Sequence, residues 1–500
     1  MSGLPKLLII YAVAIPLAIV LGFLISAPGM GSIVVIGLLI FLFSLPFLLK
    51  RHHLLLILFW NSAFNAFFLP AQPHFWLLLA GLSLGISWLN NVMGQKNFIR
   101  VPELTRPLIF FAIVVLAVAF IRGFGVRALG SSSFGGRGYF YIFGAIIGYF
   151  ALTAERIPLG KAGRWTGLFF LSGSTFALSN LIFLLGPAFY FLYLLVPPEY
   201  AISQAQSEAG TTDVDRIAGL PPTCVAIVCF LLARYGIKGI LDWRKPWRFL
   251  FFCSTLVVLG FGGFRSVYVL IGLLCIIQFF LEGLYRTIYL PISVGVVTLA
   301  VALTILFADR LPLSMQRAVS FLPVTVDSSV AADAAGSWDW RINMWKTLVP
   351  DIPRYFFVGK GYRIGPEDLY LADMATQMGL VENFEVSRVA GDYHSGPLSL
   401  IISFGVFGVI GFLWLMCAGT KVLFRNYRYG AAPLRGINSF LLAFFVAHSL
   451  FFLFFFGDIR SDLMVFTGAL GLSISVNNGV GKKPSARQRP VVAQMVSQVA

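Results

Sequence analysis

Long apolar runs alternate with short polar segments along most of the chain, and this pattern predicts the fold class. A helix needs about 20 mostly apolar residues to cross a hydrocarbon layer roughly 30 Å thick. The expected fold class is all-α: a polytopic membrane helical bundle of about 12–14 transmembrane helices. The spans are expected near residues 7–26, 32–49, 54–69, 75–94, 107–121, 139–153, 166–190, 220–235, 249–263, 266–282, 287–307, 397–418, 437–456 and 462–477.

Two of these runs need comment. The run from Trp165 to Val196 is too long for one straight span, and Pro187 is expected to kink or end it, leaving a short interfacial piece. The first run, flanked by Lys6, also resembles a signal peptide with a small-residue site at Ser26 and Ala27. Because the next span follows within a few residues, an uncleaved anchor is expected.

Composition agrees with a membrane protein. Of 500 residues, 58% are hydrophobic, 50 are Phe and only 12% are charged, which is more apolar than a water-soluble domain requires. Five regions are expected: N-terminal transmembrane helices over 1–196, transmembrane helices with an outer loop over 197–307, an extracytoplasmic cap over 308–396, C-terminal transmembrane helices over 397–477, and a disordered cytoplasmic tail over 478–500.

The cap is expected to contain two helices. One should run from Ser337, a suitable N-cap, to Pro350, and the other from Pro366 to about Met378. Between them, the glycine-rich turn FVGKGYRIG carries Lys360 and Arg363 and could approach an anion. The apolar face of the first helix should consist of Trp338, Ile342, Trp345 and Val349.

Charge placement predicts the orientation of the chain in the membrane. With a cytoplasmic amino terminus, one set of loops collects 23 Lys and Arg against four Asp and Glu, and the other set holds 14 against 17. The net charge of +16 thus divides into +19 and −3, a positive-inside pattern with both termini in the cytoplasm. The basic composition therefore indicates orientation, and no nucleic-acid partner is expected.

Arginine dominates the bases expected on the outer side. Twelve of those 14 bases are arginines, and only Lys346 and Lys360 are lysines. A planar guanidinium can grip a phosphate or a carboxylate with two hydrogen bonds. Either these arginines pair with outer acids as ordinary loop salt bridges, or some of them form an anion site.

Cysteine and histidine give no sign of a metal or disulfide site. All five Cys fall in expected spans, and no pair among the five His has metal-ligand spacing, so we expect no metal and no cofactor. His394 stands out because it lies at the mouth of the span over 397–418, followed by Gly405, Gly408 and Gly411, which permit close helix packing. It is either a lone interfacial histidine that caps a helix or a base on a rigid support.

The surroundings of His394 resemble a known signature. His394 and Ser395, nine further residues, and then a Gly-x-x-Gly pair are similar to the signature of the bacterial O-antigen ligase and O-antigen polymerase superfamily. The resemblance covers roughly residues 200–420. Three further segments agree in order: RIAGLPP at Arg216, GGFRS at Arg265, and Arg341-x-x-x-Trp345 followed by a V-G-K-G turn.

This resemblance implies a membrane glycosyltransferase of the bacterial inner membrane. Such enzymes transfer a glycan from a polyprenyl (undecaprenyl) diphosphate carrier to an acceptor hydroxyl, on lipid A core or on a growing polysaccharide, at the periplasmic face. The product belongs to the cell envelope, as lipopolysaccharide or exopolysaccharide. Arginines can stabilise the diphosphate leaving group without a metal, and direct attack would invert the anomeric centre.

The resemblance also assigns roles to residues of this chain. His394 is expected to be the general base, because imidazole titrates near neutrality, and Asp392 or Tyr393 would orient it. Arg265 and Arg216 are expected to bind the diphosphate, with Arg341 as a further ligand. The remaining outer cations that could contribute are Arg122, Arg137, Lys360 and Arg363.

Two other function classes fit part of the pattern. A transporter or flippase for a lipid-linked sugar would also need many spans and an arginine-lined cavity, although the halves of this chain show no internal repeat. A structural membrane scaffold would not need interfacial arginines. Ligase and polymerase share the same motifs, so the sequence leaves the acceptor open.

Overall fold

The computed structural model describes residues 18, 22, 30–69, 72–94, 98–126, 135–209, 215–378 and 384–483. The span expected over 7–26 lies almost entirely outside these ranges, as does the tail beyond residue 483. Within the described ranges the regular elements are helices, and nine helical segments are long and apolar enough to cross a membrane, with two shorter apolar helices beside them. The expected all-α polytopic membrane fold is confirmed.

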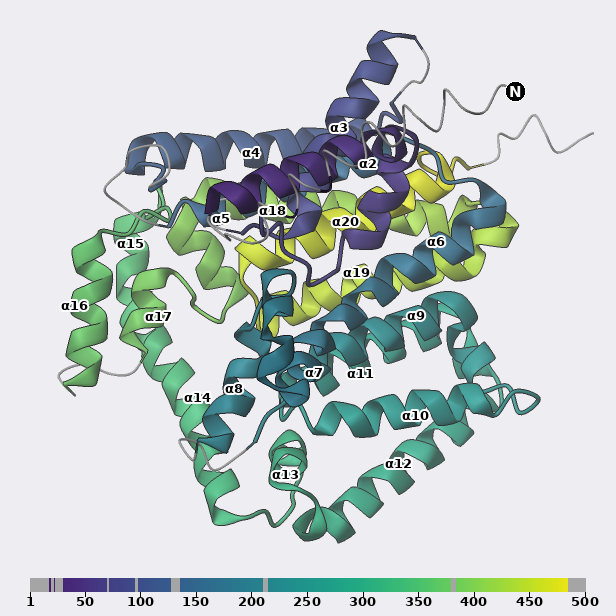
Figure 1. Cartoon of the computed structure of the whole chain (residues 1–500). Helices are drawn as coiled ribbons and strands as arrows, with labels where there is room; N and C mark the ends of the chain where they lie inside the picture. The colour runs from purple at the N-terminus through teal and green to yellow at the C-terminus, as the bar shows by residue number, and fades with distance from the viewer. Residues whose placement is uncertain are drawn as a thin grey trace, which may run out of the picture.

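A bundle of helices carries a further group of helices, most of which lie on the left in Figure 1, while α13 lies at the bottom, near α12. We call this group the cap; it lies between α12 and α18, and the end of the bundle that it covers is the cap side. The bundle consists of α2 (Met30–Phe59), α3 (Phe75–Val92), α4 (Pro102–Arg122), α5 (Arg137–Thr153), α6 (Leu159–Leu171), α7 (Ala177–Leu185), α8 (Glu199–Glu208), α9 (Leu220–Ile240), α10 (Trp247–Gly260), α11 (Arg265–Leu281), α12 (Tyr289–Phe307), α18 (Gly396–Tyr429), α19 (Arg435–Phe454) and α20 (Ile459–Asn477). The cap consists of α13 (Leu313–Val319), α14 (Ser328–Leu348), α15 (Ile352–Tyr355), α16 (Pro366–Gln377) and α17 (Glu385–Ala390).

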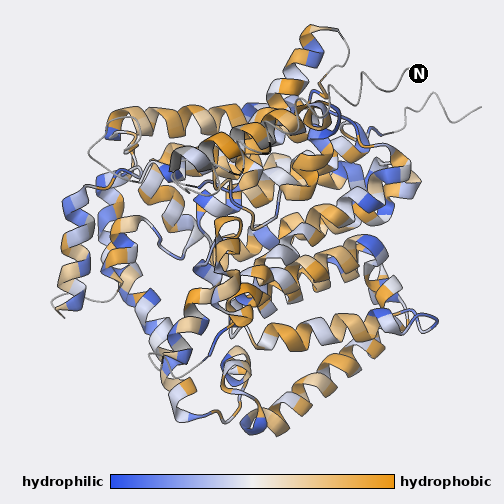
Figure 2. Cartoon of the chain, in the orientation of Figure 1, coloured by the Kyte–Doolittle hydropathy of each residue, from blue (hydrophilic) through white to orange (hydrophobic). Residues whose placement is uncertain are grey.

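Small residues allow the central helices to approach closely. A methyl group on Gly471 of α20 would lie 2.8 Å from the side chain of Leu152 in α5, and one on Gly468 would lie 2.2 Å from Trp60. In lipid there is no hydrophobic drive between helices, so such close backbone packing is a main source of association. Apolar residues cover these central helices, whereas polar residues concentrate in the cap and in the connections (Figure 2).

The segmentation expected near the amino terminus is wrong at one place. The span expected over 32–49 and the first six residues of the span expected over 54–69 belong to one continuous helix, α2, which ends at Phe59. The polar residues between them do not end the helix, because the buried imidazoles of His52 and His53 are hydrogen-bonded. His52 contacts Ser83 (2.9 Å) and Glu155 (3.3 Å), and His53 contacts the carbonyl oxygen of Leu152 (2.9 Å).

The expected break at Pro187 is confirmed. Helix α7 ends at Leu185, Gly186 adopts φ +86°, and a 3₁₀ helix follows over Pro187–Leu194. None of the eight residues of this 3₁₀ helix is buried. Proline thus converts the end of a long apolar run into a surface piece.

The cap helices were only partly expected. The helix over Pro366–Gln377 is confirmed, and the side chain of Asp368 accepts a hydrogen bond from the amide of Gly365. The start at Ser337 is wrong: α14 begins at Ser328, with Asp327 as its N-cap. The alanine-rich stretch before Ser337 favours helix strongly enough to carry it through Gly336. Trp338 and Val349 of the expected apolar face are exposed, and the face that is buried consists of Val330, Ala334, Met344 and Leu348.

A break in α18 attaches the cap to the bundle. Gly405 has φ +65° and ψ −168°, so the helix is interrupted there. Of the three glycines expected to form a packing seam, Gly411 does face the phenylalanines of α4, whereas Gly405 forms this break. Three backbone hydrogen bonds join the break to the cap: the amide of Lys360 to the carbonyl of Ile402 (2.7 Å), the amide of Gly361 to the carbonyl of Ser403 (3.0 Å), and the amide of Val406 to the carbonyl of Phe356 (2.7 Å).

Replacing Gly405 should therefore loosen the cap. In Gly405→Ala the new methyl would lie 2.7 Å from the carbonyl oxygens of Phe356 and Phe357, and the positive φ alone costs on the order of 1–3 kcal/mol. We expect a clearly lower melting temperature of the detergent-purified protein. Gly295→Ala in α12, where a methyl meets nothing within 4 Å, is the matched control. Equal melting temperatures for the two variants would contradict this account.

Candidate functional site

His394 lies between the cap and the bundle, in the short connection from α17 to α18. Its backbone adopts φ +50°, a left-handed conformation that non-glycine residues rarely take and that often marks functional positions. Its ring makes edge-to-face contacts with Trp340 of α14 (5.0 Å between centroids) and with Phe456 (5.1 Å). The imidazole is thus clamped from two sides, while 24% of its side chain remains exposed.

Asp392 fixes the orientation of this imidazole. Its Oδ1 lies 3.2 Å from Nδ1 of His394. Burial by itself would raise the pKa of Asp392, but the hydrogen bond and charge of His394, together with the charge of Arg460, outweigh burial, so the pKa is lowered. An ionised Asp392 favours the proton on Nδ1 and leaves the lone pair of Nε2 free.

The side chain of Tyr393 is buried inside the cap. Its side chain is 1% exposed and packs with Met344, Leu348 and Phe384 inside the cap. Its carbonyl oxygen accepts a hydrogen bond from Nε1 of Trp345 (2.9 Å). Tyr393 therefore holds the segment before His394 in the cap, and of the two residues expected to orient the imidazole, Asp392 is the one in contact with it.

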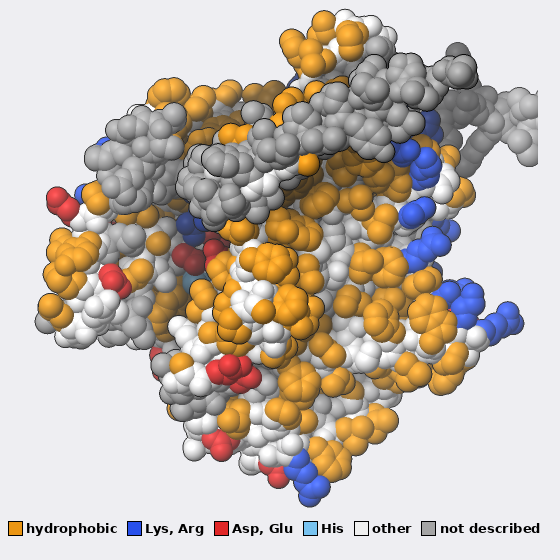
Figure 3. Space-filling view, viewed as in Figure 1, with side chains coloured by type: hydrophobic (Ala, Val, Ile, Leu, Met, Phe, Trp, Pro, Cys, Tyr) orange, Lys and Arg blue, Asp and Glu red, His pale blue; other side chains and the backbone are white. Residues whose placement is uncertain are grey.

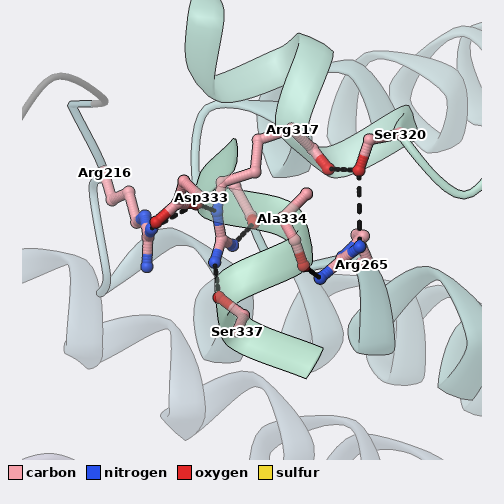
Figure 4. Close-up of polar contacts among 8 residues, drawn as sticks. Arg216, Arg265, Arg317, Ser320, Asp333, Ala334 and Ser337 are labelled. Carbon is pink, nitrogen blue, oxygen red and sulfur yellow. Dashed lines mark hydrogen bonds and ion pairs between the residues drawn. The ribbon is translucent and has the colours of Figure 1, made fainter. Parts of the chain in front are cut away.

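Arg216 takes part in a partly buried ion-pair network (Figure 4). Its Nη2 lies 2.6 and 2.7 Å from the two carboxylate oxygens of Asp333 in α14. Arg317 of α13, which is 6% exposed, binds the same carboxylate and donates further hydrogen bonds to Ser337 and to the carbonyl of Gly263. One carboxylate thus serves two guanidinium groups and ties α14 to the cap side of the bundle.

Arg265 and Arg341 have no such partner. Within the described ranges, no carboxylate forms an ion pair with either. Arg265 donates to the carbonyl of Ala334 (3.1 Å), and its other terminal nitrogen lies 3.5 Å from Oγ of Ser320 (Figure 4). The guanidinium of Arg341 lies 5.8 Å from the centre of the Phe456 ring, the ring that also contacts His394.

Electrostatics shows that these cations are close to one another. The pKa of Arg341 is lowered, first by burial and then by the charges of Arg265 and Arg317. Burial is the larger cause, and the two arginine charges add to it, so other positive charges lie close to Arg341. The site therefore joins one oriented imidazole to a half-buried group of arginines that an anion would stabilise.

The other expected cations lie elsewhere. Arg122 binds the carbonyls of Val358 and Gly359 (3.1 and 2.8 Å) and so holds the glycine-rich turn. Lys360 is partly buried in that turn, and burial, followed by the charge of Arg388, lowers its pKa. Arg363 is exposed beside Gly123. Arg137 hydrogen-bonds the Tyr141 hydroxyl (2.9 Å) and faces a cavity in the bundle.

Sequence analysis missed several residues that build the site. Phe456 precedes α20 and is far from His394 in the chain, so no spacing connects them. Arg460 pairs with Asp458 (2.6 Å) and donates to the carbonyl of Ala390 (3.1 Å), close to the histidine. The sequence does contain one signal for Arg460. It follows Asp458 by two residues at the start of an apolar run, where an unpaired charge is costly, so a pairing of the two could have been predicted. In the part of the chain that the structure describes, no group of three or more His, Cys, Asp or Glu could hold a metal ion.

Comparison with known families finds one match. Residues 249–413 match the family model described as O-antigen ligase. The matched segment contains Arg265, Arg317, Asp333, Arg341 and His394, and it leaves Arg216 and Phe456 outside. No curated protein matches the chain.

The ion-pair network generates a prediction about stability. Burial alone would raise the pKa of Asp333, but the hydrogen bond and charge of Arg317 and the charge of Arg216 lower it below 3.8. A carboxyl group with a depressed folded pKa stabilises the fold above its unfolded pKa, and this contribution disappears as the pH falls through the folded pKa. Asp333→Asn should thus cost on the order of 2 kcal/mol at pH 7, because Arg317 stays buried without its carboxylate.

Melting of the purified protein against pH is the measurement. The gap between wild type and Asp333→Asn should be constant from pH 7 to about pH 4 and should shrink below that. Asp339→Asn, an exposed carboxylate on the same helix, should melt like wild type. A gap that widened on acidification would contradict the assignment.

Proposed function

We propose that the chain, in which residues 249–413 match the O-antigen ligase family model, is a membrane glycosyltransferase of the O-antigen ligase and polymerase superfamily. It transfers a glycan from a polyprenyl diphosphate carrier to a saccharide hydroxyl, on lipid A core or on a growing polysaccharide. The reaction takes place at the periplasmic face of the bacterial inner membrane, where the cap lies, and both termini are cytoplasmic.

One observation supports this proposal: the imidazole of His394, with Asp392 at its Nδ1, contacts the same Phe456 ring as the guanidinium of Arg341, which forms no ion pair with a described carboxylate. The carrier diphosphate binds Arg265 and Arg341, which stabilise the charge that develops as it leaves. Nε2 of His394 takes the proton of the acceptor hydroxyl. The acceptor oxygen forms the new bond to the anomeric carbon as the bond from that carbon to the diphosphate breaks, with inversion.

Arg216 and Arg317 support this site through Asp333. Their shared carboxylate cancels part of their charge, so they contribute less to the anion site than the two arginines without a carboxylate partner. They hold α14, which carries Arg341 and Trp340, against the bundle. The proposed diphosphate ligands are therefore Arg265 and Arg341, with Arg216 as a supporting cation.

The distribution of charge supports the orientation. In Figure 3, Lys and Arg side chains gather along the edge of the bundle away from the cap, whereas acidic side chains lie toward the cap side. Cytoplasmic segments of membrane proteins carry the excess of Lys and Arg. The cap and His394 would accordingly face the periplasm.

Reconstitution tests the proposal against the competing class, a transporter or flippase for a lipid-linked sugar. Purified protein in liposomes should convert a polyprenyl diphosphate-linked oligosaccharide and an acceptor into elongated product, and it should do so in EDTA, since arginines supply the charge that a metal would. Movement of the donor between leaflets without product would favour transport. Activity that vanished in EDTA and returned with Mg²⁺ would refute the metal-free mechanism.

His394→Gln tests the base. Glutamine keeps the approximate size and some hydrogen bonding but cannot titrate near neutrality, so transfer should fall on the order of a hundredfold or more. Donor binding should remain, because the diphosphate is bound by arginines. A well-folded variant that binds donor and keeps more than about a third of the wild-type rate, a far smaller loss than a base contributes, would rule out the assignment.

Arg265→Lys tests the geometry of the anion site. Lysine keeps the charge but cannot offer two parallel N–H groups, so the rate of transfer should fall strongly while the protein still folds. Arg310→Lys, an exposed arginine at the end of α12, is the matched control and should retain the wild-type rate. Comparable rates for the two variants would make Arg265 a generic interfacial cation.

A further inference from the structure

A cavity of about 800 Å³ lies inside the bundle next to the proposed transfer site. Several of its lining residues are immediate neighbours of site residues: Val267 is two positions after Arg265, and Ala390 is two positions before Asp392. Arg460, whose side chain binds the carbonyl of Ala390, lines it as well. Arg460 also acts electrostatically on Asp392, so it connects the cavity with the segment that carries His394.

The cavity runs from the cap side into the bundle. Its rim is formed at the starts of helices, including Pro222 of α9 and Ser461 of α20. Its wall continues along α9 to Cys229, which is about 10 Å deeper at 1.5 Å per helical residue. The deeper lining is mostly apolar, with Phe170, Val225, Phe444 and Met464 from four different elements, and His448 of α19 lines it as well. A space with this lining and depth favours a hydrocarbon chain.

One cation at the rim, Arg137, forms no ion pair with a described carboxylate. Arg137 lines the cavity and contacts the Tyr141 hydroxyl, and within the described ranges it forms no ion pair. Burial, and then the charge of Arg137, lowers the pKa of the neighbouring His74 to about 4, so His74 is neutral at pH 7. Glu199 also lines the cavity, but it does not pair with Arg137. Arg460 is already paired with Asp458.

We infer that this cavity holds the first part of the polyprenyl chain of the carrier, and that Arg137 at its rim binds the diphosphate. The inference rests on the proposed function. In a glycan diphosphate lipid, the reacting anomeric carbon is joined to the chain only through the two phosphates. The chain must therefore leave the site within a few bonds of Arg265 and Arg341, and the cavity is the apolar space at that place. Residues of the cavity wall would then select the carrier.

Binding of carriers that bear no glycan tests this without turnover. Affinities for undecaprenyl diphosphate, farnesyl diphosphate and inorganic diphosphate are measured on the full chain in phosphatidylcholine nanodiscs. Wild type should prefer the two prenyl diphosphates over inorganic diphosphate by about tenfold or more, because part of the chain is buried. Val225→Phe, which fills the cavity, should remove most of that preference. Val257→Phe on the exposed face of α10 should keep it.

Arg137→Gln should weaken the binding of both prenyl diphosphates about tenfold, the usual loss for one charge-assisted hydrogen-bonding partner. Arg310→Gln is the matched control and should bind like wild type. Equal affinity of wild type for prenyl and inorganic diphosphate would overturn the inference, and so would unchanged binding in both Val225→Phe and Arg137→Gln. Displacement of undecaprenyl diphosphate by an equal amount of phosphatidylglycerol would also overturn it, since the cavity would then hold an ordinary membrane lipid.

The two proposals fail separately. If Arg265→Gln binds undecaprenyl diphosphate like wild type while Val225→Phe and Arg137→Gln do not, the diphosphate assignment of Arg265 is wrong and the cavity inference stands. If Arg265→Gln loses binding while the cavity variants keep both affinity and chain preference, the proposed function stands and the cavity inference is wrong.

Discussion

The broken backbone of α18 at Gly405 is the constraint on which the site depends. A regular helix uses its own carbonyl groups, whereas the break frees those of Ile402 and Ser403 to bind the turn at residues 360–361. The same helix begins one residue after Ser395 and so positions His394. One element thereby fixes both the histidine and the cap that presents Trp340 and Arg341 to it, and relative movement of the two would cost these buried hydrogen bonds.

A second constraint is the unequal number of charges around α14. Asp333 is shared by Arg216 and Arg317, while Arg265 and Arg341 have no carboxylate among the described residues. Half-buried cations without counter-ions raise the free energy of the empty protein. An anion that binds there neutralises these cations and lowers the free energy of the protein. The unfavourable charge of the empty site thus contributes to the affinity for the anion. The family match covers Arg265, Arg317, Asp333 and Arg341 but not Arg216, and the proposed diphosphate ligands lie within it.

The cavity beside the cluster extends the same argument into the membrane. Arg137, Arg265 and Arg341 would meet the charged part of a lipid-linked donor, and the walls formed by α9, α19 and α20 would meet its chain. The cations at the rim and the apolar side chains below them follow the same order as the diphosphate and the hydrocarbon chain of such a lipid. The protein would then recognise both the diphosphate of the carrier and the part of its chain next to the diphosphate. The acceptor would approach from the cap.

The sequence by itself determined the membrane fold, most span positions and the break at Pro187, because these follow from local hydropathy and from proline. A short motif drew attention to His394, whose role stays a prediction. It misplaced the start of α14 and divided α2, since buried partners such as Ser83 and Glu155 cannot be read along the chain. Only the tertiary structure decided which arginines share Asp333 and which ring contacts His394, because the ion pair of Arg216 with Asp333 spans 117 positions and Phe456 lies beyond the end of α19. Contacts between distant segments depend on how helices pack, and packing has no periodicity in the sequence.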